Sequence, residues 1–105
     1  SEDTAKGILK ASESQNDPLW RLPLFDDYDR HLDSGYAALS STGVSAFGGA
    51  ITAALFLRRF AGKKSNWAQI DLMAWNLNSR PGRPKGGEAM GLRALFSYIS
   101  SLAKR

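Results

Sequence analysis

The sequence of 105 residues contains no cysteine, which excludes disulfide bonds and thiolate metal sites. This absence suits a reducing compartment, and we expect a cytoplasmic location, with an organellar matrix as the alternative. Long hydrophobic runs are also lacking: the longest, Ala50 to Leu57, is far shorter than the roughly 20 residues needed to cross a bilayer. The acidic start at Glu2 and Asp3 does not resemble a secretory signal. We therefore expect no membrane partner.

Metal ligands are scarce as well. The single histidine, His31, lies between Arg30 and Leu32 on a predicted surface helix, and a ligand needs convergent partners. Four aspartates lie close together in the sequence, but a helix places them on different faces: Asp26, Asp27, Asp29 and Asp33. The sequence therefore predicts no catalytic residue and no metal ligand within this chain.

Charge gives one alternative interpretation. The formal net charge is +4 and the pI is near 9.7, which favours a small basic nucleic-acid-binding module. Most of the 14 basic residues lie in three separate places, around Arg58, around Arg83 and at Lys104, and no aromatic residues interleave with them to form a stacking surface. A solvated surface explains them better, so we expect no nucleic-acid partner.

The chain is predicted to be mainly helical. A short helix is expected within residues 4–11, inside a lead-in over residues 1–17 that is flexible or truncated, and an extended apolar segment follows over residues 19–25. Two aspartates favour a helix start at Asp26. The clearest helix covers Ala50 to Ala61 and is ended by Gly62. A loop over residues 78–87 precedes a closing amphipathic helix from Glu88 to Ala103.

A single strand is predicted over Asn66 to Leu72. Its apolar residues lie on both faces, which is typical of a strand covered by helices on two sides. Since one strand cannot make a sheet, either the chain pairs with strands that it does not contain, or the fold is helical and Trp67 to Leu72 is a core segment. The predicted fold class is α/β, with this strand in need of partner strands.

Several ordered blocks of the sequence resemble the M17 leucyl aminopeptidases, also called cytosol aminopeptidases. The resemblance covers roughly Leu9 to Leu102 and implies a bacterial or organellar origin. The blocks are Pro18-Leu19-Trp20-Arg21-Leu22-Pro23-Leu24, Gly48 to Leu57, Trp67 to Leu72, Met73-Ala74-Trp75-Asn76, Arg80-Pro81-Gly82-Arg83-Pro84 and Gly86-Gly87.

This resemblance implies that residues 1–105 form a single segment, the C-terminal part of the family's catalytic domain. That domain is an α/β/α sandwich that binds two divalent metals, zinc or manganese, through residues that precede the matching block. Met73, Ala74, Trp75 and Asn76 match positions that flank the pocket for the substrate's N-terminal residue. The resemblance therefore implies a wall of the substrate pocket and a packing surface, without metal ligands. We expect the chain alone to be inactive.

Two departures from the family pattern favour a different class of protein. The family usually has Asp after Ala37 and His after Ala68, where this chain has Ala38 and Gln69. Both changes remove an ionisable group, and we hypothesise that the two missing side chains support each other. The alternative is a noncatalytic, peptidase-derived subunit that serves as a structural component of a larger assembly. In either case we expect the remainder of the peptidase or other protein subunits as partners, within an oligomer.

Overall fold

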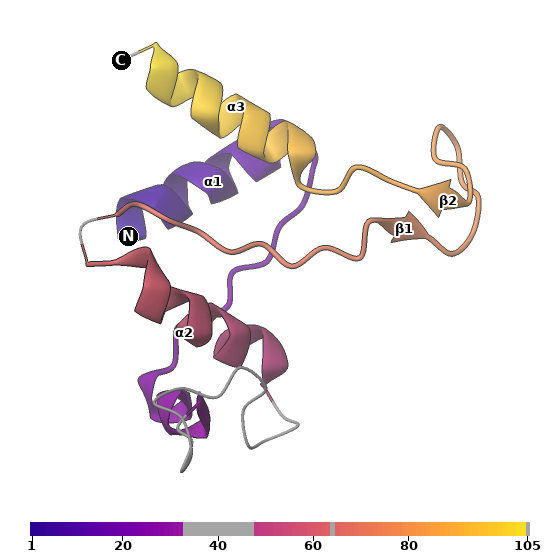
Figure 1. Cartoon of the computed structure of the whole chain (residues 1–105). Helices are drawn as coiled ribbons and strands as arrows, with labels where there is room; N and C mark the ends of the chain where they lie inside the picture. Colours follow the sequence, from indigo (N-terminus) through magenta and orange to yellow (C-terminus); the bar gives the residue numbers. More distant parts are fainter. Residues whose placement is uncertain (33–47, 64, 105) are drawn as a thin grey trace. The chain divides into compact units, whose positions relative to one another are not determined.

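The computed structural model describes residues 1–32, 48–63 and 65–104, and the chain divides into two compact units (Figure 1). The first unit combines Ser1–Arg21 with Ile70–Arg105, and the second is Leu22–Gln69. The elements in chain order are α1 (Glu2–Ser14), the 3-10 helix η1 (Asp26–Leu32), α2 (Gly49–Ala61), β1 (Trp75–Asn76), β2 (Gly86–Gly87) and α3 (Leu92–Ala103).

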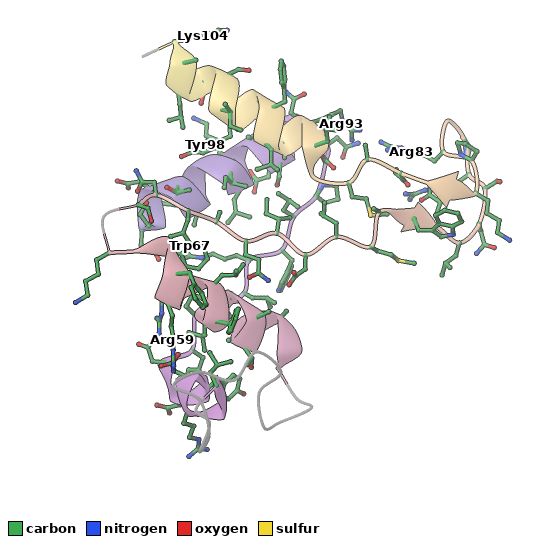
Figure 2. The ribbon with its side chains drawn as sticks, viewed as in Figure 1. Arg59, Trp67, Arg83, Arg93, Tyr98 and Lys104 are labelled. Atoms are coloured by element: carbon green, nitrogen blue, oxygen red, sulfur yellow. The ribbon has the colours of Figure 1, made fainter. Side chains whose placement is uncertain are left out.

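The first unit is built on α1 packed against α3, the two helices that lie side by side in Figure 1. Ile8 and Ala11 of α1 are buried, as is Ala94 of α3. Close approach is possible because α1 has a glycine at the contact: a Cβ atom on Gly7 would lie 2.4 Å from Cε2 of Tyr98. Figure 2 shows Tyr98 on α3, on the side of α1. Gly7 is thus a packing residue rather than a helix breaker.

The end of α1 is closed by a pair of crossed backbone hydrogen bonds. Asn16 has a φ of 48°, and its N–H donates to the carbonyl of Glu13 at 3.2 Å. The N–H of Asp17 donates to the carbonyl of Ser12 at 3.0 Å. This is a Schellman motif with asparagine in the left-handed position that glycine usually fills. It turns the chain sharply at Asp17.

The second unit joins η1 to α2 by ion pairs. Arg59 binds Asp29 with a 2.7 Å contact to Oδ2 and donates a further hydrogen bond to the Asp29 carbonyl at 3.2 Å. Arg58 contacts Asp26 at 2.7 Å. Leu32 and Leu55 are buried in this unit. As predicted, α2 ends at Gly62, which has a φ of 76°.

The small sheet lies elsewhere than the sequence suggested. β1 and β2 pair antiparallel, with Trp75 opposite Gly87 and Asn76 opposite Gly86. The strand predicted over Asn66 to Leu72, which needs partner strands, is not formed within the described residues: residues 65–74 are neither helix nor strand, and none of residues 66–72 is buried. A strand forms only where its backbone pairs in a regular ladder of hydrogen bonds with a neighbouring strand. The fold class is α/β: the residues that the structure describes are mostly helical and contain one two-stranded sheet.

Two of the predicted helices have different first or last residues in the structure. The first helix is longer than predicted and fills residues 2–14 of the expected lead-in, while the closing helix begins at Leu92 rather than at Glu88. None of the helices in residues 1–32, 48–63 and 65–104 is both long and apolar enough to cross a membrane.

Candidate functional site

The four predicted pocket residues, 73–76, lie where the chain enters β1. Ala74 has a φ of 53°, a left-handed conformation that is uncommon for a residue with a Cβ atom. Its carbonyl accepts a hydrogen bond from the N–H of Glu88 at 3.0 Å. The backbone at Ala74 is therefore held in an unfavourable conformation by the strand opposite, which is a pattern often found at functional positions.

Exposure divides the four residues into two kinds. Met73 is 61% exposed and Trp75 is 49% exposed, and Ala74 is exposed with them. Asn76 is only 6% exposed, and its Nδ2 donates to the carbonyl of Pro84 at 3.2 Å. Met73, Ala74 and Trp75 are therefore open to solvent, whereas Asn76 ties β1 to the loop that follows.

That loop, residues 77–85, is anchored mainly by its backbone. Arg80 and Arg83 exchange two backbone hydrogen bonds of 2.9 and 2.8 Å. The N–H of Lys85 donates to Oγ of Ser79 at 3.0 Å. With Pro81 and Pro84 restricting φ, these contacts give a tight, basic loop next to the exposed Trp75.

A buried acid lies beneath this loop. Glu88 has a side chain that is 8% exposed, and its Oε1 accepts a hydrogen bond from Nη1 of Arg83. Its Oε2 lies 3.5 Å from Nη2 of Arg80. Nothing in the local sequence marks Glu88 as a residue of the site. The available signal was an acid five residues after Arg83 and eight after Arg80, a spacing that is informative only once the loop is known to fold back.

A second acid that the sequence analysis passed over holds α3. Asp17 is buried, and its carboxylate accepts hydrogen bonds from the N–H of Gly91 at 2.9 Å and of Ala94 at 3.1 Å. Burial by itself would raise the pKa of Asp17, but these hydrogen bonds and the nearby charge of Arg93 outweigh it, so the pKa is lowered. Figure 2 shows Arg93 at the start of α3. Asp17 therefore caps a helix whose N-cap residue, Gly91, lies 74 residues later in the chain.

No metal site is formed by the side chains that the structure describes. These residues contain no group of three or more His, Cys, Asp or Glu side chains placed to hold an ion. A cavity of about 370 Å³ is lined by residues near the end of α1: Leu9, Ser12, Glu13, Asn16, Pro18 and Leu19. None of the four predicted pocket residues lines it.

Comparison with known proteins decides the family. The model of the cytosol aminopeptidase family's catalytic domain matches residues 1–96. This chain belongs to the cytosol aminopeptidase family. The crystal structure of the cytosol aminopeptidase from Coxiella burnetii superimposes with a TM-score of 0.92 at 48% sequence identity, over 96% of this chain and 22% of that one. The predicted resemblance is thus confirmed.

Other relatives of the family agree. A probable cytosol aminopeptidase of Geobacter sulfurreducens is 40% identical over 101 residues, which is 94% of this chain and 20% of that protein. Leucine aminopeptidase 1 of Arabidopsis thaliana is 38% identical over 101 residues, covering 94% of this chain and 18% of that protein. The chain spans about a fifth of the length of these relatives.

One expectation drawn from the family pattern lies outside the described residues. The hypothesis that the family's Asp and His support each other depends on the separation of Ala38 from Gln69. Gln69 is half-buried at the end of the second unit, and Ala38 belongs to the residues that the structure leaves undescribed.

Proposed function

We propose that this chain acts as the C-terminal part of a metal-dependent leucyl aminopeptidase, which removes N-terminal residues from peptides. The observation that carries the proposal is the match to the Coxiella burnetii enzyme over 96% of this chain but 22% of that one. A segment that follows a known peptidase this closely is expected to keep its place within the peptidase.

The metals are proposed to be held by the rest of the enzyme. The family resemblance implies two divalent ions, zinc or manganese, but the residues described here offer no ligand group that fits them. When bound, such metals would polarise the scissile carbonyl and activate a water molecule. No step of that chemistry is assigned to a residue of this chain, and we expect the chain alone to be inactive.

The part assigned to this chain is to receive the substrate's N-terminal side chain. Met73 and Trp75 present apolar surface, as pocket walls commonly do. Asn76 fixes the loop behind them through its hydrogen bond to Pro84. Apolar contact of this kind favours a substrate with a large hydrophobic first residue, because burying such a side chain releases about 1.5–3 kcal/mol.

The remaining surface is proposed to pack against protein. Large hydrophobic side chains are exposed on α3 and on the segment before η1, namely Leu92, Phe96, Ile99, Trp20, Leu22, Leu24 and Phe25. Exposed apolar area of this kind marks an interaction surface. We assign it to the remainder of the peptidase within an oligomer in the cytoplasm.

A chimera tests the proposal. The 105 residues replace the matching region of the Coxiella burnetii enzyme, and hydrolysis of leucine amide is measured with zinc or manganese. We expect the chimera to be active and the purified 105-residue chain to be inactive. Trp75→Ala in the chimera should raise KM for leucine amide more than for alanine amide. Metal-dependent turnover by the homogeneous chain alone would overturn the assignment of the chemistry to other residues.

A noncatalytic subunit is the second candidate, and Gln69 favours it, since relatives usually carry His there. An inactive chimera that regains activity with Gln69→His would support this reading. The native mass of the purified protein, together with the chains that copurify, then identifies the assembly that it joins.

A further inference from the structure

We propose that Glu88 is a positioning residue that clamps the basic loop, residues 77–85, onto the exposed wall at Ala74 and Trp75. The clamp is a property of this chain, whereas its consequence for substrate binding rests on the proposed function. The loop and wall would then present one fixed shape to a peptide.

Glu88 is placed to join two separate parts of the site. Its backbone N–H donates to the carbonyl of Ala74, on the wall, at 3.0 Å. Its side chain accepts from Arg83 and lies 3.5 Å from Arg80, both in the loop. Figure 2 shows Arg83 beside β1 and β2, and Glu88 is the residue that comes directly after β2. One residue therefore connects the loop to the strained backbone position.

The charges explain why a carboxylate is needed here. Arg80 and Arg83 are brought together by their mutual backbone hydrogen bonds, so their two positive side chains share one end of the loop. Like charges at this spacing repel, and a buried carboxylate between them removes the repulsion. Glutamine has the same size but cannot supply the charge, so Glu88→Gln separates the electrostatic role from packing.

The two arginines contribute unequally. Arg83 is 36% exposed and donates a hydrogen bond to Oε1, whereas Arg80 is 63% exposed and Oε2 accepts no hydrogen bond from it. A buried carboxylate loses most when its hydrogen-bonded partner is removed. Arg83→Ala should therefore loosen the loop more than Arg80→Ala.

Limited digestion of the full 105-residue chain with trypsin tests the clamp. Arg80 and Arg83 each precede proline and resist trypsin, so the bond between Lys85 and Gly86 is the cleavable site in this loop. Glu88→Gln should speed cleavage there by about tenfold, because local opening governs cleavage and a charge-assisted hydrogen bond is lost. The matched control is Glu13→Gln, an exposed acid on α1, which should leave the rate unchanged.

A merely structural role predicts a different result. General loosening would also speed cleavage after Lys6, Lys10 and Arg93, on the two packed helices, whereas the clamp predicts that those rates stay constant. Exchanging the charges, with Glu88→Arg and Arg83→Glu together, should restore at least part of the protection after Lys85. If trypsin cleaves the Glu88→Gln variant after Lys85 at the same rate as the wild-type chain, the proposal is overturned.

The consequence for substrate binding has its own readout in the active chimera. Glu88→Gln should raise KM for leucine amide severalfold with a smaller change in kcat, because the wall and not the reacting centre is disturbed. If KM is unchanged while cleavage after Lys85 is faster, the role of Glu88 in substrate binding is overturned but the clamp on the loop is not. An inactive chimera would count against the proposed function and leave the digestion result standing.

Discussion

The carboxylate of Asp17 lies 2.9 Å from the backbone nitrogen of Gly91, at the start of α3. It also accepts from Ala94, so one side chain satisfies two N–H groups that the helix itself leaves open. Because the N–H of Asp17 also makes the outer hydrogen bond of the Schellman motif, to the carbonyl of Ser12, the end of the first helix is connected directly to the beginning of the last.

Removal of this cap should weaken the first unit. Asp17→Ala leaves two buried N–H groups without their acceptor, and we expect the free energy of unfolding to fall by about 2 kcal/mol. Asp17→Asn keeps one acceptor oxygen and should cost roughly half as much. Urea denaturation followed by far-UV circular dichroism measures both. The control Glu13→Gln should change stability by less than about 0.5 kcal/mol; an equal loss in the control would contradict the assignment.

Acid should remove the same stabilisation. The pKa of Asp17 is lower in the folded chain than in the unfolded chain, where aspartate titrates near about 3.9. The ionised carboxylate therefore stabilises the fold fully above the unfolded pKa, and this contribution is lost as the pH falls through the folded pKa. The difference in unfolding free energy between wild type and Asp17→Asn should shrink from pH 6 toward pH 3. A difference that stays constant over this range would show that the charge of Asp17 does not matter.

Gly7→Ala should be destabilising although alanine favours helix. The new methyl group would lie 2.4 Å from the ring of Tyr98, and overpacking of this kind costs about 1–3 kcal/mol. Thermal unfolding should show a lower midpoint. Gly49→Ala is the matched control, because a Cβ atom there meets nothing within 4 Å and the helix should gain. Tyr98→Leu should reduce the penalty of Gly7→Ala, and additive effects in the double variant would exclude the contact as its cause.

The two arginines that end α2 should differ in importance. Arg59 donates hydrogen bonds to both the carboxylate and the backbone carbonyl of Asp29. Arg58 donates to a single carboxylate oxygen of the exposed Asp26. We expect Arg59→Ala to cost about 1 kcal/mol and Arg58→Ala about 0.3 kcal/mol. Urea denaturation of both variants at low and high salt checks which loses more unfolding free energy. Salt screens the ion pairs, so the difference between the two losses should be smaller at high salt. Equal losses for the two variants would show that the backbone contact of Arg59 adds nothing.

Local patterns predicted the helices best. Residues 50–61 are apolar almost all round and are followed by Gly62, and α2 has nearly these limits. The start of α3 was misplaced by four residues, because the group that caps it is Asp17, far away in the sequence. No local signal at Glu88 reveals that capping group.

The strand and the site could be predicted from the sequence only in part, because both depend on tertiary contacts. The apolar pattern of Trp67 to Leu72 is suited to a strand, but a strand also needs a neighbouring strand to pair with, and residues 65–74 form neither helix nor strand in the structure. The segment Met73 to Asn76 could be chosen by resemblance to the family. Its division into exposed Met73 and Trp75 and buried Asn76 depends on how residues 77–88 fold back, and that is set by tertiary contacts at Glu88 and Pro84.

The division into units has a consequence for the order of folding. The second unit, Leu22–Gln69, is continuous, whereas the first unit needs residues from both sides of it. During synthesis α1 leaves the ribosome before α3 and lacks its packing partner until α3 has been made. The continuous unit can therefore form first, and its formation shortens the loop that must close before Asp17 can reach Gly91. A nascent chain that stalls before α3 would display the apolar face of α1, which makes that interval the stage at which chaperones are most needed.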